Sequence, residues 1–243
     1  MGERKMEHIL VVDDEEALVW AVSKSLGFHG YTVSCAASGI EALQQIQLHP
    51  PDLLLLDIAM PGIDGVELCA RLRDDPQWHR LPIIFLTGLS EMRNKIAAFT
   101  VGADDYLGKP FDMHELMLRI KAVLRRAQLG KATEAPVPPE PDALETGALR
   151  LDLRRATVKT DRGVVGLTPI ELNLLKYLMQ HTGEIFSSEQ LLQKVWAYPA
   201  GTGDPALVRW HIKNLRCKIE PAPEHPLYLH TVPHHGYMLI TPG

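Results

Sequence analysis

The sequence predicts an α/β domain built on a doubly wound, five-stranded parallel sheet, followed by a small α+β domain. Uninterrupted apolar runs such as Ile9–Val12 and Leu53–Leu56 are typical of parallel strands that are buried on both faces. Amphipathic segments that open with helix-capping residues alternate with these runs. A proline-rich segment, 127–143, then divides the chain into two halves.

In the first half we expect strands at 9–12, 32–36, 53–56, 83–87 and 105–107. Helices between them are expected to begin at capping signatures, in which Ser38 precedes Glu41, Asp64 precedes Glu67 and Asp112 precedes Glu115. Because strands and helices alternate, the strands are parallel and the connections are crossovers. Residues 1–126 therefore form the first predicted domain.

The rest of the chain has a different pattern. Residues 127–143 hold four prolines and few large apolar side chains, which predicts a linker stiffened by polyproline II geometry. In 144–243 we expect short strands at 148–153 and 156–159 and a closing hairpin of 228–232 with 236–240. Three helices are expected to begin at the capping residues Thr168, Ser187 and Asp204.

Composition limits the classes of protein that fit. The 243 residues are 46% hydrophobic, enough for two cores, and no apolar run approaches the roughly 18 residues of a membrane span. No signal peptide is expected at the start, and the three separated cysteines suggest neither disulfides nor a metal clip, so we expect a cytoplasmic protein. Residues 1–126 hold 13 Lys/Arg and 18 Asp/Glu, whereas 144–243 hold 11 and 9, so the second half is the more basic one.

Acidic residues follow two of the predicted strands. Asp13 and Asp14 come directly after the first strand, and Asp57 closes the third. The carboxyl ends of parallel strands meet at one edge of the sheet, where open α/β sheets bind ligands. Three carboxylates gathered there repel one another unless a cation lies between them, so the sequence predicts a divalent-metal site, with Mg²⁺ as the metal.

Further residues at the same edge complete a site for phosphoryl transfer. Asp57 can attack phosphorus as a carboxylate nucleophile, while Thr87 and Lys109, at the ends of the fourth and fifth strands, can bind phosphoryl oxygens. A dinucleotide site is disfavoured, because the first loop is acidic and has no glycine. A phosphatase with paired aspartates is disfavoured as well, because position 59 is Ala and offers no general acid.

Residues 9–126 resemble the receiver domain of two-component response regulators, a flavodoxin/CheY-like fold. The motifs are Val11-Val12-Asp13-Asp14-Glu15, Leu56-Asp57-Ile58-Ala59-Met60-Pro61-Gly62, Leu86-Thr87 and the run from Gly102 to Phe111. The resemblance implies that a sensor histidine kinase phosphorylates Asp57 with Mg²⁺, and that the backbone carbonyl of Ala59 is a further metal ligand. It also implies a cis Lys109-Pro110 bond and a switch pair, Thr87 and Tyr106.

In the last predicted helix, Arg209, Lys213 and Arg216 form a basic stripe opposite the apolar face. Residues 144–243 resemble the winged helix-turn-helix DNA-binding domain of the OmpR/PhoB subfamily, through the motifs Leu167–Glu171, Val195-Trp196, His211–Arg216, Thr231-Val232 and Gly236-Tyr237. This implies that the stripe enters the major groove, that His211 and Lys218 lie near phosphates, and that the wing lies at the minor groove.

The chain departs from that subfamily at the wing, where Pro233-His234-His235 replaces the usual Arg-Gly, and at the recognition helix, where Ala206 and Arg209 replace Arg and Asp. As a hypothesis, His234 and His235 make DNA binding pH-dependent, because imidazole titrates near neutrality.

The resemblance also implies a receiver dimer. Its expected interface has an apolar patch of Ile96, Phe99 and Met117, and ion pairs across a twofold axis of Lys95 with Glu115, Asp104 with Lys121, and Asp105 with Arg119. Phosphorylation is then expected to promote a homodimer that binds two DNA half-sites, with RNA polymerase as an optional further partner and no membrane partner.

Two alternatives stay open. One is a constitutive DNA binder whose receiver serves only for dimerisation or protein docking; the other is an enzyme that acts on small phosphorylated substrates. A further hypothesis is a long-lived acyl phosphate, because Ala59 and Leu89 carry no group that orients water. The expected protein otherwise catalyses only its own phosphorylation and dephosphorylation.

Overall fold

The computed structural model describes residues 6–88, 101–129 and 142–241. The chain divides into two compact units, Met1–Leu124 and Arg125–Gly243. Among the described residues, no helix combines the length and the apolar character needed to cross a lipid bilayer.

The first unit contains a five-stranded parallel sheet in the order β2-β1-β3-β4-β5, which confirms the predicted fold class. Its strands are β1 (His8–Val12), β2 (Thr32–Ala36), β3 (Leu53–Asp57), β4 (Ile83–Gly88) and β5 (Asp105–Lys109). All of β3 and most of β1 and β4 are buried, as expected of strands covered on both faces.

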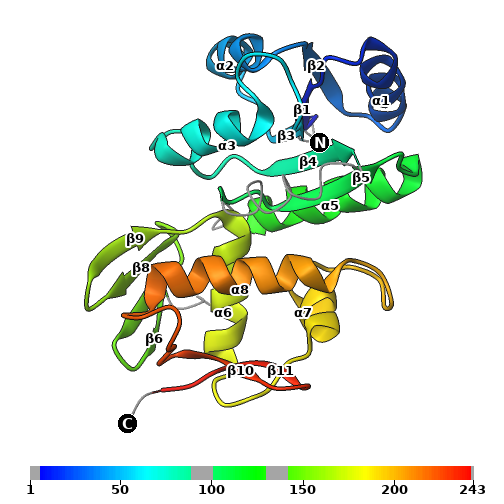
Figure 1. The fold of residues 1–243 in the computed structure, drawn as a ribbon. Helices are drawn as coiled ribbons and strands as arrows, with labels where there is room; N and C mark the ends of the chain where they lie inside the picture. The colour runs from blue at the N-terminus through cyan, green and yellow to red at the C-terminus, as the bar shows by residue number, and fades with distance from the viewer. Residues whose placement is uncertain (1–5, 89–100, 130–141, 242–243) are drawn as a thin grey trace, which may run out of the picture. The chain divides into compact units, whose positions relative to one another are not determined.

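Four described helices cover the two faces of this sheet: α1 (Glu16–Phe28), α2 (Gly39–Leu48), α3 (Gly65–Asp74) and α5 (Met113–Leu129). Helices α2 and α3 pack on one face through a cluster that includes Ile46 and Leu68, and α1 and α5 pack on the other through Leu26 and Ile120 (Figure 1). The expected caps are present: the backbone N–H groups of Glu41, Glu67 and Glu115 donate to the side chains of Ser38, Asp64 and Asp112.

The second unit begins with a four-stranded antiparallel sheet of β6 (Ala143–Thr146), β7 (Leu149–Asp152), β8 (Thr157–Thr160) and β9 (Gly163–Gly166). Sequence patterns predict only the two middle strands. Strands β6 and β9 are four residues long, and β9 has no buried residue, so neither carries a clear apolar pattern.

Three helices and a hairpin complete the second unit. The helices are α6 (Pro169–Gln180), α7 (Ser188–Lys194) and α8 (Pro205–Ile219), and the hairpin pairs β10 (Leu229–Val232) with β11 (Gly236–Leu239). Helices α6 and α7 both begin with complete capping boxes, and Asp204 caps α8. This arrangement of helices followed by a hairpin agrees with the predicted winged helix.

Candidate metal centre and nucleic-acid interface

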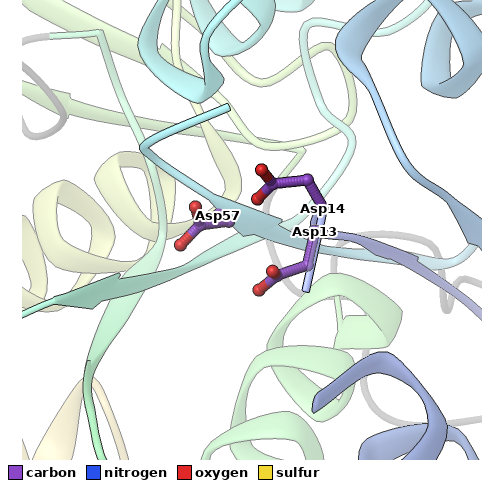
Figure 2. Close-up of side chains that lie close together, drawn as sticks. All are labelled: Asp13, Asp14 and Asp57. Carbon is purple, nitrogen blue, oxygen red and sulfur yellow. The ribbon is translucent and has the colours of Figure 1, made fainter. Parts of the chain in front are cut away.

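Three carboxylates meet at the carboxyl edge of the parallel sheet. Asp57 is the last residue of β3, and Asp13 and Asp14 follow β1, the strand that pairs with β3. One oxygen from each carboxylate lies within 4.8 Å of the others (Figure 2). Asp13 and Asp57 are buried, whereas Asp14 is exposed, so the cluster is open to solvent on the side of Asp14.

A third strand, β5, brings a cation to this cluster. Lys109, which ends β5, places its Nζ 2.6 Å from Oδ2 of Asp13 and 2.8 Å from Oδ1 of Asp57. Burial by itself lowers the pKa of Lys109, but hydrogen bonds to the two carboxylates and their charges outweigh burial, so its pKa is raised. The ammonium group therefore stays charged between the two acids.

Asp57 is held on its other side by backbone. Its Oδ2 accepts a hydrogen bond of 3.0 Å from the N–H of Ala59. Burial raises the pKa of Asp57; Lys109 and the Ala59 N–H lower it, and the nearby charge of Asp13 adds to the rise, so the net shift is upward. A divalent cation bound to the three acids opposes this shift, since it stabilises the carboxylate form.

Thr87 and Tyr106, the expected switch pair, lie on adjacent strands. Thr87 is fully buried near the end of β4 and pairs with Gly108 of β5, and its hydroxyl donates to the carbonyl of Gly88. Tyr106 is half-buried and packs against the cluster under α2 and α3. The Lys109-Pro110 bond is cis, as the resemblance implies.

Gly65 is a residue of this site that sequence reasoning missed. It is the first residue of α3, and its N–H donates to the carbonyl of Ile58. A Cβ atom built on Gly65 would lie 2.0 Å from the backbone oxygen of Asp57, so only glycine permits this approach of helix to strand end. The sequence held one indication of this role, since Gly65 directly follows the capping residue Asp64 after the strand that ends in Asp57.

The expected dimer residues have partners within the single chain. Lys95, Ile96 and Phe99 lie outside the described residues. Asp104 is buried and accepts hydrogen bonds from Arg73 and from the N–H of Ile83. Its expected pairing with Lys121 joins two chains and stays a prediction. Arg73 of α3 also donates to the carbonyls of Leu81 and Gly102 and thereby ties α3 to the segment that precedes β5.

The remaining expected interface residues lie on or beside α5. Arg119 pairs with both Asp105 and Glu115 in the same chain, at 2.9 Å and 2.6 Å. Met117 is buried in the core cluster beside Leu116. Its expected place in an apolar patch of the dimer interface stays a prediction, because Ile96 and Phe99 lie outside the described residues. If Asp105 pairs with Arg119 of a second chain across a twofold axis, the Asp105–Arg119 ion pair within each chain must break first.

Helix α8 presents only part of the expected DNA-binding set to solvent. Arg209 and Lys213 are exposed, and Nζ of Lys213 lies 5.3 Å from the ring centroid of Trp210. Arg216 is partly buried, and its guanidinium donates to the carbonyl of Leu229 and to the hydroxyl of Thr231. Arg216 is therefore directed toward the hairpin.

Of the two expected phosphate contacts, His211 is contradicted by its burial, and Lys218 is partly exposed but paired within the domain. His211 is fully buried, with its ring centroid 5.4 Å from that of Trp196, because it follows Val208 by three positions on the apolar face of α8. Lys218 lies 2.6 Å from a buried oxygen of Glu171 and donates to the carbonyl of Gly166, so its charge is used inside the domain.

The hairpin tip is arranged as expected. His234 and His235 are exposed between β10 and β11, and His234 adopts a positive φ of 63°. Nδ1 of His235 lies 2.8 Å from the carbonyl oxygen of Pro233, and the N–H of His235 donates to Val232. Both imidazole rings are thus available at the tip of the wing.

Comparison with known proteins assigns both halves of the chain to known domain families. Residues 9–121 match the model of the response regulator receiver domain, and residues 161–239 match that of the C-terminal domain of transcriptional regulatory proteins. The chain is 37% identical over 238 residues to the DNA-binding dual master transcriptional regulator RpaA of Synechocystis sp., covering 96% of this chain and 95% of that protein.

Another relative is the alkaline phosphatase synthesis transcriptional regulatory protein PhoP of Bacillus subtilis, which is 38% identical over 237 residues, with 96% of this chain and 97% of that protein covered. A solved structure of a RitR mutant matches with a TM-score of 0.73 and 26% sequence identity, covering 97% of this chain and 99% of that chain. The chain therefore belongs to the OmpR/PhoB-type response regulators, which join a receiver domain to a DNA-binding domain that regulates transcription.

Proposed function

We propose that this transcription regulator is activated when Asp57 accepts a phosphoryl group from a sensor histidine kinase in the presence of Mg²⁺. The observation that carries the proposal is the convergence of Asp13, Asp14 and Asp57 within 4.8 Å, with Lys109 between two of them. The receiver domain implies a kinase partner, and the C-terminal domain implies DNA as the ligand.

The donor set fits a magnesium ion. Mg²⁺ prefers oxygen ligands and is usually held by one or two carboxylates with several waters, which suits two buried acids and the exposed Asp14. The backbone carbonyl of Ala59 is the proposed further ligand. When bound, the metal would neutralise charge on the phosphoryl oxygens.

Asp57, Lys109 and Thr87 have separate roles in the proposed phosphoryl transfer. An oxygen of Asp57 forms a bond to phosphorus while the bond from phosphorus to the imidazole nitrogen of the donor breaks, leaving the donor histidine and an acyl phosphate. Lys109 lies 2.8 Å from Asp57 Oδ1 and is placed to bind a phosphoryl oxygen as a point charge. The buried hydroxyl of Thr87 would turn from the carbonyl of Gly88 toward the new phosphoryl group.

Movement of Thr87 would transmit the phosphorylation of Asp57 to the rest of the receiver domain. Space that Thr87 vacates allows Tyr106, which is half-buried on the adjacent strand, to turn inward. We propose that this movement favours a receiver dimer formed through the expected interface residues of β5 and α5. A dimer raises the local concentration of the second DNA-binding domain and tightens binding to two half-sites.

For DNA we propose that the exposed face of α8, with Arg209 and Lys213, enters the major groove, and that His234 and His235 of the wing lie near the minor groove. His211 and Lys218 are not among the proposed DNA contacts, because His211 is buried and Lys218 pairs with Glu171. The protein itself catalyses no reaction beyond its own phosphorylation and dephosphorylation.

The test compares the native chain with Asp57→Asn, each with and without Mg²⁺ and a small phosphoramidate donor. We expect intact-protein mass spectrometry to find one phosphoryl group on the native chain only when Mg²⁺ is present, and none on Asp57→Asn. DNA affinity and oligomeric state, measured on the same samples, should rise only in the modified sample. If DNA binds equally well in all samples, the constitutive alternative is correct and this proposal is wrong.

A further inference from the structure

The hairpin of the second unit needs support from outside its own two strands. Strands β10 and β11 are four residues each, and an isolated two-stranded hairpin is at best marginally stable in water. Strand β11 is supported by backbone, since Phe186 and Tyr237 exchange two hydrogen bonds of 2.9 Å. Strand β10 is supported by side chains of α8.

Two residues supply the support for β10: Arg216 of α8, and Glu220, which caps the C-terminus of that helix. Nε of Arg216 donates to the carbonyl of Leu229 at 2.9 Å, and Nη2 donates to the hydroxyl of Thr231 at 2.8 Å. Glu220, the capping residue, is fully buried, and its carboxylate accepts hydrogen bonds from the N–H groups of Leu227, Tyr228 and Leu229. Leu229 is thus held through both its N–H and its carbonyl.

We propose that Arg216 and Glu220, with Leu229 and Thr231, form a helix–wing brace that sets the position of the wing relative to the DNA-binding face of α8. Arg216 is then a positioning residue, which acts on DNA through the wing rather than by reading bases or phosphates. This inference rests on the proposed DNA contacts of α8 and the wing.

The geometry of the contact separates this role from a direct one. The guanidinium is a planar fork whose two donors reach different acceptors two residues apart on β10. Lysine has the same charge, but its donors share one nitrogen atom, so it does not reproduce the fixed spacing of the two guanidinium nitrogens that reach Leu229 and Thr231. A direct phosphate contact, in contrast, needs mainly the charge, and lysine retains it.

The experiment uses the full-length chain with three variants: Arg216→Lys, Thr231→Val and the double variant. Thr231 is exposed, so the removal of its hydroxyl leaves the fold intact. DNA that the phosphorylated native protein selects from random sequences serves as the probe. Arg155→Lys is the matched control, because Arg155 is an exposed arginine of the same unit and lies outside α8 and the wing.

We expect Arg216→Lys to weaken DNA binding by about tenfold and Thr231→Val by about threefold. The double variant should bind no more weakly than Arg216→Lys, because both changes remove the same contact. Backbone amides of residues 229–232 in the free protein should exchange hydrogen about tenfold faster in Arg216→Lys and at the native rate in Arg155→Lys.

Native-like DNA affinity in Arg216→Lys, additive losses in the double variant, or unchanged amide exchange in the wing would each overturn the brace. If the native protein selects no DNA, the proposed function fails, and amide exchange in the free protein still decides whether the brace exists.

Discussion

Lys109 Nζ lies 2.6 Å from Oδ2 of Asp13, a residue 96 positions earlier in the chain. The same ammonium group lies 2.8 Å from Asp57, so one lysine pairs with two of the three acids that would bind Mg²⁺. Under the proposed function, Lys109 and Mg²⁺ would therefore compete for the same carboxylates.

Replacement of this lysine should tighten metal binding. We expect Lys109→Met to bind Mg²⁺ or Mn²⁺ about tenfold more tightly, because the variant removes a positive charge that repels the cation. Phosphorylation of Asp57 should nevertheless slow, since the phosphoryl group loses a cationic partner. Calorimetry with Mn²⁺ measures the first effect, and Lys121→Met, at an exposed position of α5, is the control. Weaker metal binding in Lys109→Met would contradict the competition.

The titration of Asp57 should respond in opposite directions to its two charged neighbours. Its pKa is raised by burial and by the charge of Asp13 and lowered by Lys109. Lys109→Met should therefore shift the Asp57 midpoint to higher pH, and Asp13→Asn should shift it to lower pH. Carbon NMR of the carboxyl group without divalent metal measures both midpoints. The carboxylate form of Asp57 is the nucleophile. As the pH is lowered, phosphorylation should therefore be lost at a higher pH in Lys109→Met than in the native chain. Shifts in the same direction would reject this account.

Gly65 should not tolerate a side chain. Its Cβ would meet the backbone oxygen of Asp57 at 2.0 Å, so Gly65→Ala should lower the free energy of unfolding by about 1 to 3 kcal/mol and slow phosphorylation. Gly27→Ala is a matched control in α1, where a Cβ has no neighbour within 4 Å. That change should stabilise the protein by about 0.5 to 1 kcal/mol through helix propensity. Urea unfolding measures both, and equal effects of the two variants would show that the contact is unimportant.

The imidazole rings at the wing tip should make DNA binding pH-dependent. His234 and His235 are exposed, and imidazole changes charge between about pH 5 and 8, so affinity should be higher at mildly acid pH than at alkaline pH. The double variant His234→Gln, His235→Gln should lose this difference, and His225→Gln, on an exposed loop of the same unit, should keep it. A pH response that survives the double variant must come from other groups.

The acyl phosphate should be long-lived because Ala59 offers no group that orients water. We expect Ala59→Gln to shorten its lifetime by about tenfold, because an amide two residues after Asp57 can position the attacking water. Ala21→Gln, at an exposed position of α1, controls for the added side chain. Loss of the label is followed by mass spectrometry after removal of the donor. A native lifetime of only seconds would refute the argument.

The sequence by itself determined the parallel sheet and the edge at which its acids meet. Apolar runs at Ile9–Val12 and Leu53–Leu56 predict buried strands, and the carboxyl ends of neighbouring parallel strands must lie together, so Asp13 and Asp57 converge whatever the details of packing. Helix starts were also predictable, because capping residues such as Ser38 and Thr168 act locally.

Tertiary structure decided which polar side chains are used inside the protein. Helical spacing places Arg216 on a basic stripe, but only the folded hairpin supplies the Leu229 carbonyl that it binds, and only the packing of α3 brings Arg73 to Asp104. Residue type and spacing state what a side chain can bond to, while its actual partner depends on elements distant in the chain. His211 lies between these cases, since its spacing from Val208 already indicated the buried face of α8.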